Sequence, residues 1–297
     1  MDTFWYGREV IDSNPSKSLH VHEVDIRDQS SLSEVMHGVT DVIHLACISN
    51  DPSFDLNPQL GKSINLDAFE PLVQLSINNG VQRFIYASSS SVYGVKEEEK
   101  VTEDLSLEPL TDYSKFKAMC EDILLNYASS NFVCTVLRPA TVCGWSPRQR
   151  FDLSVNILTN HAVNNGQIKV FGGTQYRPNI HIEDMVDAYL LTLNAPESIV
   201  NSEVFNVGSD NLSINQIAEE VSRNTGVDKI VHEPTDDLRS YRIDSSKISK
   251  ALGFQFRRNV GSAVMDLVKA FNEKKFQDPM NNAMYFNIKR MKELELR

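Results

Sequence analysis

The chain has 297 residues, of which 41% are hydrophobic, and a formal net charge of −11. The apolar fraction is sufficient for a buried core, in one large domain or two smaller ones. The sequence holds no run of lysine and arginine and no apolar run of about 20 residues, so we expect neither a nucleic-acid partner nor a membrane span.

In the first half of the chain, strand-like runs alternate with helix-like stretches. The runs "DVIHLAC" (41–47), "RFIYAS" (83–88) and "FVCTVLRPA" (132–140) are apolar on both faces, as are buried strands of a parallel sheet. Residues 58–80 and 112–128 between these runs predict two long helices. The alternation predicts an α/β fold with a doubly wound parallel sheet.

After about residue 145 the sequence becomes richer in loops, with the polar segments "GWSPRQRFD" and "FGGTQYRPN". The run "IKVFG" (168–172) between them predicts a strand, and "EVFNVGS" (203–209) predicts another. Helices are expected at 182–195, at about 213–225 and at about 260–274, followed by a charged tail. The second half therefore predicts a smaller, loop-rich unit beside the sheet.

The cysteines and histidines show no metal-ligand spacing, so we expect no metal. Cys47 and Cys134 lie in apolar runs and are interpreted as buried free thiols, which are typical of a reducing compartment. The N-terminal "MDTFWYGREV" does not resemble a signal peptide, and together these features predict a cytoplasmic protein. His44, in "VIHLAC", is expected to be a packed core histidine.

Four consecutive serines follow a predicted buried strand in "YASSSSVYG" (86–94). Serine is a poor strand residue because its hydroxyl competes for backbone hydrogen bonds. The run therefore indicates either a capped turn or a set of hydroxyls directed at a ligand.

Tyr113 and Lys117 lie four residues apart on a predicted helix, so both side chains share one face. A tyrosine can transfer a proton to or from a substrate oxygen, and a neighbouring ammonium group favours its phenolate form. We therefore expect Lys117 to lower the pKa of Tyr113. The pair becomes more specific because its helix follows the strand that ends in serines.

Several segments together resemble the extended short-chain dehydrogenase/reductases, in particular the NAD-dependent nucleotide-sugar epimerases and dehydratases. The resemblance runs from residue 2 to about residue 255, through "DIRD", "HLAC", "SSSSVYG", "YSKFK", "LRPA", "RPNIHIEDM" and "RSYRIDSSKISKALGF". It implies that Ser89, Tyr113 and Lys117 are catalytic, that NAD is the cofactor, and that the substrate is a nucleotide-diphosphate sugar.

The resemblance also implies binding residues. Those expected to contact the cofactor are Asp2, Asp25, Ile26, Leu45, Ala46, Asn65, Ser88, Tyr113, Lys117 and Pro139. Those expected to contact the substrate are Ser89, Phe171, Arg177 and Arg239. The two arginines would neutralise the diphosphate, and Phe171 would stack on the base. The acidic Asp2 favours NAD, because a carboxylate disfavours the 2′-phosphate of NADP.

Two features depart from the family pattern. The family opens with a strand, a G-x-x-G-x-x-G turn and a helix, whereas this chain contains no such glycine pattern. We therefore expect an N-terminally truncated form, lacking roughly 30 residues of a βαβ unit and binding NAD poorly. Cys143 stands where the family often has tyrosine, and is interpreted as a core thiol, with an acid or base role as the alternative.

The implied architecture is a Rossmann-like doubly wound sheet without its first strand-turn-helix, plus a smaller α/β domain. The NAD-binding domain is predicted at 1–148, with 178–208 returning to it, and the substrate domain at 149–177 and 209–297. The predicted long helices carry surplus apolar residues, which favours a homodimer.

The predicted function is NAD-dependent epimerisation of a nucleotide-diphosphate sugar, at C4 through a 4-keto intermediate, as in UDP-glucose 4-epimerases. The alternatives are a 4-keto-sugar reductase or a dehydratase of the same family, or a non-catalytic relative that binds nucleotide sugars. A dehydratase needs an acid and a base beside the sugar. Here Ser89 is followed by Ser90 and Ser91, which disfavours dehydration.

Overall fold

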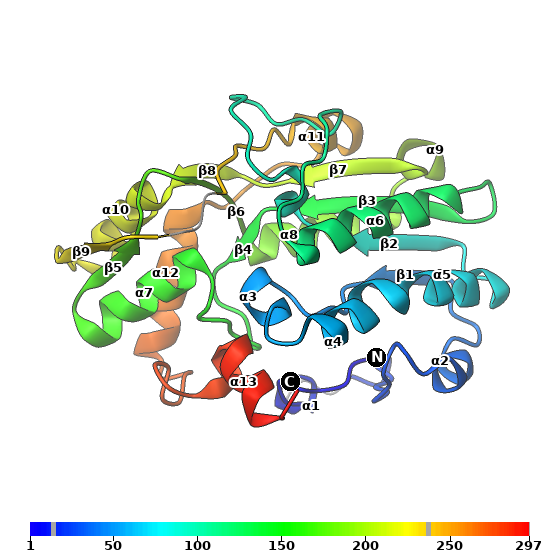
Figure 1. Cartoon of the computed structure of the whole chain (residues 1–297), viewed down its shortest axis with the longest axis horizontal. Coiled ribbons are helices and arrows are strands. Elements are labelled where there is room, and N and C mark those ends of the chain that lie inside the picture. Colours follow the sequence, from blue (N-terminus) through cyan, green and yellow to red (C-terminus); the bar gives the residue numbers. More distant parts are fainter. Residues whose placement is uncertain (13–15, 236–238, 297) are drawn as a thin grey trace.

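A parallel sheet of four strands, in the order β1-β2-β3-β7, lies at the centre of the larger part of the fold (Figure 1). The computed structural model describes residues 1–12, 16–235 and 239–296. The strands are β1 (Asp41–His44), β2 (Arg83–Ala87), β3 (Val133–Pro139) and β7 (Glu203–Val207). The predicted α/β class is confirmed, and β7 returns from the second half of the chain to pair with β3.

Helices cover both faces of this sheet. On one face, α2 (Gln29–Val35), α5 (Phe69–Asn78) and α6 (Asp112–Asn126) pack over Phe84 and Tyr86 of β2. On the other face, α8 (Ile182–Asn194) and α11 (Ser246–Leu252) pack over residues that include Ile85. Alternate residues of β2 thus enter opposite cores, as strand geometry requires.

The single helix predicted at 58–80 is wrong, because the structure divides it into three pieces. These are α4 (Pro58–Lys62), a π-helical turn η1 (Ser63–Asp67), and α5. Asn65 lies in the π-turn, where its amide accepts a hydrogen bond from Ile48 N at 2.8 Å and donates one to Ile48 O at 2.9 Å. The wider turn lets Asn65 hold the loop after β1, and π-turns commonly occur at functional sites.

Two smaller sheets lie beside the main one (Figure 1). One has the order β4-β6-β8, formed by β4 (Thr141–Cys143), β6 (Tyr176–His181) and β8 (Asp210–Ser213). The other pairs β5 (Ile168–Phe171) with β9 (Ile230–Glu233).

Three helices form a separate apolar core with these smaller sheets. They are α7 (Ser154–Asn165), α10 (Ile214–Thr225) and α12 (Val260–Asn272), and their buried residues include Val155, Ile217 and Val264. Short helices complete the fold: α1 (Glu9–Asp12), α3 (Asp51–Phe54), α9 (Glu197–Val200) and α13 (Asn287–Glu293).

The C-terminal segment is charged, as expected, and part of it folds back as α13, which the sequence did not predict. Asn287 and Met291 of this helix are buried, and Arg290 Nε donates to Trp5 O at 2.5 Å. These apolar and polar contacts hold the C-terminal helix next to the N-terminal segment (Figure 1).

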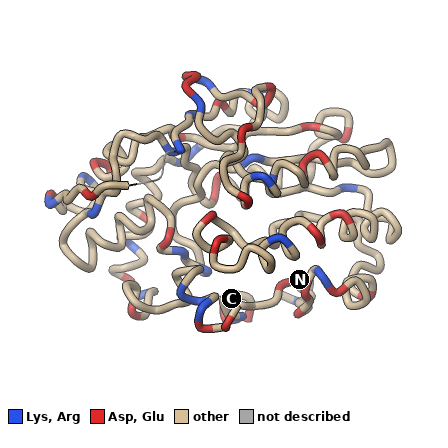
Figure 2. Tube along the Cα trace, in the orientation of Figure 1, with Lys and Arg blue, Asp and Glu red and all other residues tan. Residues whose placement is uncertain are grey.

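Acidic and basic residues are interspersed along the described chain (Figure 2). Among the described residues, no helix has both the length and the apolar character needed to cross a bilayer. The predicted boundaries between two domains remain a prediction.

Candidate functional site

A pocket of about 480 Å³ opens where β2 and β3 end. All four residues of the serine run, Ser88 to Ser91, line it. Ser89 also caps the short 3-10 helix η2 (Ser90–Tyr93), because its Oγ accepts a hydrogen bond from Ser91 N at 3.1 Å. The interpretation as a capped turn is confirmed, and the position of the serines at a pocket leaves their contact with a ligand as a prediction.

Helix α6 brings Tyr113 and Lys117 to the same place. The helix begins with a capping box, in which Thr111 and Ser114 each satisfy a backbone N–H of the other. Tyr113, in the first turn, lines the pocket. Lys117 is 4% exposed, and its Nζ donates to Ala87 O, the last residue of β2, at 2.6 Å. The sequence-predicted residues Ser89, Tyr113 and Lys117 thus meet at one end of β2.

The expected lowering of the Tyr113 pKa is wrong in its net direction. Burial raises the pKa of Tyr113, and the nearby Cys47 and Asp51 raise it further, whereas Arg150 and the hydrogen bond with Ser89 lower it. Lys117 Nζ lies 6.0 Å from the centre of the Tyr113 ring and is already bound to a carbonyl. Burial outweighs the neighbouring charges, and helical spacing alone does not reveal burial.

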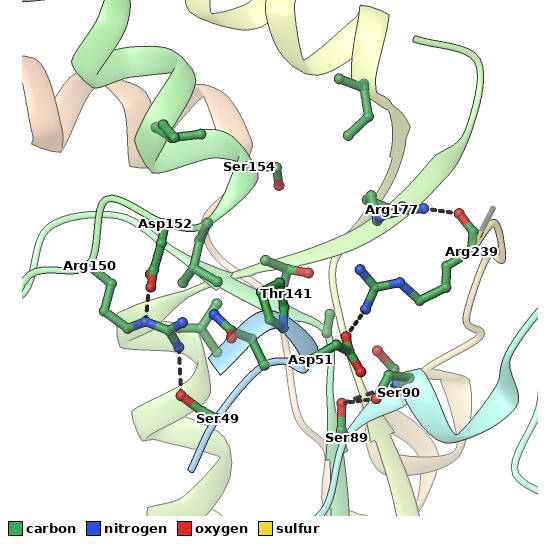
Figure 3. Close-up of a pocket in the computed structure, with 18 of the residues that line it drawn as sticks. Ser49, Asp51, Ser89, Ser90, Thr141, Arg150, Asp152, Ser154, Arg177 and Arg239 are labelled. Atoms are coloured by element: carbon green, nitrogen blue, oxygen red, sulfur yellow. Dashed lines mark hydrogen bonds and ion pairs between the residues drawn. The ribbon is translucent and has the colours of Figure 1, made fainter. Parts of the chain in front are cut away.

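The predicted substrate arginines also reach the pocket (Figure 3). Arg239 forms an ion pair with Asp51, and Arg177 Nη1 donates to the carbonyl of Arg239. Phe171 lines the same pocket and is 45% exposed. Asp51, which sequence reasoning missed, therefore competes with any anionic ligand for Arg239.

A second set of polar residues that sequence reasoning missed lies across the pocket (Figure 3). Arg150 Nε donates to Asp152 Oδ1 at 2.9 Å, and Arg150 Nη1 donates to Ser49 Oγ at 3.1 Å. Within the described residues, the buried Arg150 Nη2 and Ser154 Oγ have no hydrogen-bond partner. The basic loop "PRQRFD", between a strand and a helix, was the available signal.

The predicted cofactor residues fall into two groups. Ser88 and Pro139 line the pocket together with Tyr113. Asp2 and Asp25 are not among the lining residues of the pocket, and they lie on neighbouring segments, since Asp2 forms an isolated bridge with Glu23.

The remaining predicted cofactor residues make mainly protein contacts or are exposed. Asp25 is paired with Arg27 at 2.6 Å, and hydrogen bonding to Arg27 lowers the pKa of that carboxyl. Ile26 packs partly buried against the core, whereas Leu45 and Ala46 are exposed just after β1. Asn65 is buried and bound to Ile48.

His44 and Cys143 are core residues. His44 packs against Phe69, Phe84 and Tyr86, and burial lowers its pKa to about 3. The thiol of Cys143 is buried against Ile180 O at 3.4 Å, and burial raises its pKa, which argues against an acid or base role. The described residues contain no group of three or more side chains able to hold a metal ion.

The chain resembles sugar-nucleotide enzymes in sequence. It is 27% identical over 256 residues to a UDP-glucose 4-epimerase of Lactobacillus helveticus, covering 79% of this chain and 78% of the relative. It is 30% identical over 220 residues to YtcB of Bacillus subtilis, described as an uncharacterized UDP-glucose epimerase, covering 70% of this chain and 67% of the relative.

The chain also resembles solved structures in its fold. MoeE5 in complex with UDP-glucuronic acid and NAD superposes with a TM-score of 0.78 at 26% identity, covering 88% of each chain. The UDP-glucose 4-epimerase of Thermotoga maritima with UDP-glucose gives a TM-score of 0.79 at 26% identity, covering 88% of this chain and 87% of that chain. The dTDP-glucose 4,6-dehydratase DesIV of Streptomyces venezuelae gives a TM-score of 0.81 at 20% identity, covering 91% of this chain and 85% of that chain, and shares the fold.

A family profile covers more than half of the chain. Residues 6–208, which hold the serine run, Tyr113 and Lys117, match the NAD-dependent epimerase/dehydratase family. The sequence motifs, the parallel sheet and the pocket at its carboxyl edge agree with this match. The chain belongs to the NAD-dependent epimerase/dehydratase family.

Proposed function

We propose that this protein epimerises a nucleotide-diphosphate sugar at C4 through a 4-keto intermediate. The observation that carries the proposal is a single pocket that holds both a proton-transfer group and arginines. Ser89, Tyr113, Arg177 and Arg239 all line this pocket. This arrangement suits a substrate whose sugar reacts while its diphosphate is neutralised.

The residues fit one end of NAD better than the other. Ser88, Tyr113 and Pro139 line the pocket where the nicotinamide and its ribose would be held, and Lys117 is buried beside them. The pyrophosphate of a dinucleotide needs the backbone amides of a glycine-rich turn, and the printed sequence contains no such pattern. Assays of this chain therefore need added NAD in excess.

The chain's own residues would divide the work as follows. Tyr113 in its phenolate form, which burial disfavours and which the positive charges of Lys117 and of bound NAD would favour, takes the proton of the C4 hydroxyl and later returns it. Ser89 hydrogen-bonds the same oxygen. Lys117 fixes the end of β2 through Ala87 O. NAD, when bound, supplies the acceptor and the donor for the hydride at C4.

The pocket favours epimerisation over dehydration. Dehydration needs an acid and a base that are both available to the sugar. The carboxylates among the described lining residues are Asp51 and Asp152, and they form ion pairs with Arg239 and Arg150. Ser90 and Ser91 follow Ser89 and cannot supply this chemistry near neutral pH.

Arg150 and Ser154 suggest which sugar is preferred. Their buried Nη2 and Oγ atoms have no hydrogen-bond partner within the described residues. A buried donor without a partner costs about 1–3 kcal/mol, which a carboxylate on the sugar would recover. The proposed preference for a UDP-hexuronate rests on these two atoms, since MoeE5 is solved with UDP-glucuronic acid and also with UDP-glucose.

The proposal extends to assembly, location and domain organisation. Ile77 on α5 and Met119 on α6 are exposed apolar residues, 37% and 46% respectively, and a homodimer through these helices would cover them. A monomer mass in light scattering would contradict it. The four free cysteines agree with a cytoplasmic location. The sheet-based domain would hold NAD, and the smaller sheets would hold the sugar nucleotide.

A substrate panel tests the proposed reaction. The protein is incubated with excess NAD and UDP-glucose, UDP-galactose, UDP-glucuronate or UDP-galacturonate, and products are identified by mass and by proton resonance. We expect interconversion of C4 epimers at unchanged mass, with the uronates turned over most efficiently. Loss of water would contradict epimerisation. In a parallel incubation with NADH or NADPH in place of NAD, stoichiometric consumption of the reduced cofactor would indicate a reductase.

A further inference from the structure

A buried ion pair lies directly behind the serine run. Glu121 on α6 and Arg138 on β3 are 2% and 5% exposed. Arg138 Nη2 donates to Glu121 Oε2 at 2.6 Å, and Arg138 Nε lies 3.1 Å from both carboxylate oxygens. Burial disfavours the guanidinium charge, but hydrogen bonds and attraction to Glu121 outweigh it and raise the pKa of Arg138.

Stability alone does not explain such a pair. Removing two charges from water is costly, and replacing a buried ion pair by apolar residues is often neutral or stabilising. What the pair does provide is geometry, since a two-point contact between a planar guanidinium and a carboxylate fixes both side chains. The pair can therefore hold other groups in a fixed position.

The pair holds the segments on both sides of Ser89. On the N-terminal side, the hydroxyl of Ser88 donates to Glu121 Oε1. On the C-terminal side, Arg138 Nη1 donates to the hydroxyl of Tyr93, the last residue of η2, at 2.7 Å. The chain from Ser88 to Tyr93 is thus attached to Glu121 at one end and to Arg138 at the other.

The same helix face carries the proton-transfer group. Tyr113, Lys117 and Glu121 follow one another at spacings of four residues on α6. Lys117 binds the carbonyl of Ala87, and Glu121 binds the hydroxyl of the next residue, Ser88. Two successive contacts therefore set the position of α6 along the end of β2, and with it the position of Tyr113 relative to Ser89.

We propose that Glu121 and Arg138 are positioning residues, which set the placement of Ser89 relative to Tyr113 through the hydroxyl of Ser88. The inference rests on the proposed function for its kinetic readout. Neither Glu121 nor Arg138 is among the lining residues of the pocket, so their effect on the pocket would pass through Ser88, which lines it. A misplaced pair of reacting groups lowers turnover much more than binding.

The most informative variant is Ser88→Ala, because it removes the hydrogen bond from Ser88 to Glu121 and leaves the ion pair intact. We expect kcat to fall about tenfold or more, with KM for the UDP-sugar within about twofold of the wild type. Ser76→Ala is the matched control, since Ser76 Oγ is also buried and donates to Leu72 O at 2.7 Å on α5. It should lower stability similarly and leave kcat unchanged.

A double-mutant cycle separates positioning from direct contact. If Ser88 acts through Glu121, then adding Glu121→Gln to Ser88→Ala lowers kcat little further, so that the two effects are not additive. Additive losses, or an unchanged kcat in Ser88→Ala, would overturn the inference. Should Glu121→Gln fail to fold, Glu121→Asp takes its place in the cycle, because the shorter side chain keeps the charge and withdraws the carboxylate from Ser88.

A readout that needs no turnover keeps the inference distinct from the proposed function. Fluorotyrosine is incorporated at position 113, and its fluorine resonance is followed in the wild type and in both serine variants. The resonance should move in Ser88→Ala and stay in place in Ser76→Ala. If the wild type turns over no UDP-sugar and the resonance still moves, the proposed function fails and the positioning role stands. An unmoved resonance in Ser88→Ala would refute the positioning role.

Discussion

Asp51→Asn should tighten the binding of UDP. In the structure the Asp51 carboxylate pairs with Arg239, one of the two arginines proposed to receive the diphosphate. A diphosphate must displace this carboxylate or share the arginine with it. Asparagine keeps the size of the side chain and can still accept the hydrogen bond that the Thr111 hydroxyl gives to Asp51, so the start of α6 should be preserved.

The expected magnitude follows from the burial of the pair. The side chains of Arg239 and Asp51 are 28% and 11% exposed, between a surface pair and a fully buried one. Solvent screening limits such a pair to about 1–2 kcal/mol, below the larger couplings measured for desolvated charges. Removing the competitor should therefore lower the dissociation constant of UDP by about 5- to 30-fold.

Calorimetric titration with UDP measures this change. The control is Asp152→Asn, which removes a pocket carboxylate that is 19% exposed and pairs with Arg150 instead. A general reduction of negative charge would tighten binding equally in both variants. The reasoning is refuted if Asp51→Asn binds UDP no more tightly than the wild type, or if Asp152→Asn gives the same gain.

Three further predictions concern catalysis, stability and the cofactor. Tyr113→Phe should lower kcat by about 100-fold or more, because the proton-transfer group is lost, whereas Lys117→Met should lower kcat by about tenfold. Both values are measured by steady-state kinetics with excess NAD, and a larger loss in Lys117→Met than in Tyr113→Phe would contradict the prediction. Burial lowers the pKa of His44 from 6.5 to about 3, so between these values the unfolded chain binds the proton and the folded one does not. Unfolding free energy should therefore fall as pH decreases through this window, by up to about 1.4 kcal/mol per pH unit, and urea titrations should show a shallower fall in His44→Leu. The 297-residue chain should bind NAD weakly because it contains no glycine-rich turn, and low-micromolar binding in calorimetry would contradict that expectation.

Local patterns were sufficient for the sheet and for the reacting groups. Apolar runs located β1, β2, β3 and β7, because strands buried on both faces need such runs. The spacing of Tyr113 and Lys117 placed both on one helix face, and the serines ended the neighbouring strand. Where a motif lies within one element, its sequence largely fixes its geometry.

Contacts between distant segments were not predictable in this way. Asp51 and Arg239 are 188 residues apart, and Ser88 and Glu121 are 33 apart, so neither pairing leaves a local pattern. The π-turn at Asn65 depends on a contact with Ile48, which helical periodicity does not register. The direction in which the pKa of Tyr113 shifts depends on burial by surrounding elements. Reasoning from the charge of Lys117 alone predicted a lower pKa, whereas the pKa is raised.

The central claim is that hydride leaves C4 of the sugar and returns to the same carbon. The most direct measurement uses a UDP-sugar deuterated at C4, incubated in ordinary water with excess NAD, and follows the label in the epimer by mass and proton resonance. Because Tyr113 handles only the hydroxyl proton, the epimer should keep its deuterium at C4 and gain none of the solvent's hydrogen there. Replacement of the label by solvent hydrogen, or an epimer inverted at a different carbon, would contradict the proposed reaction.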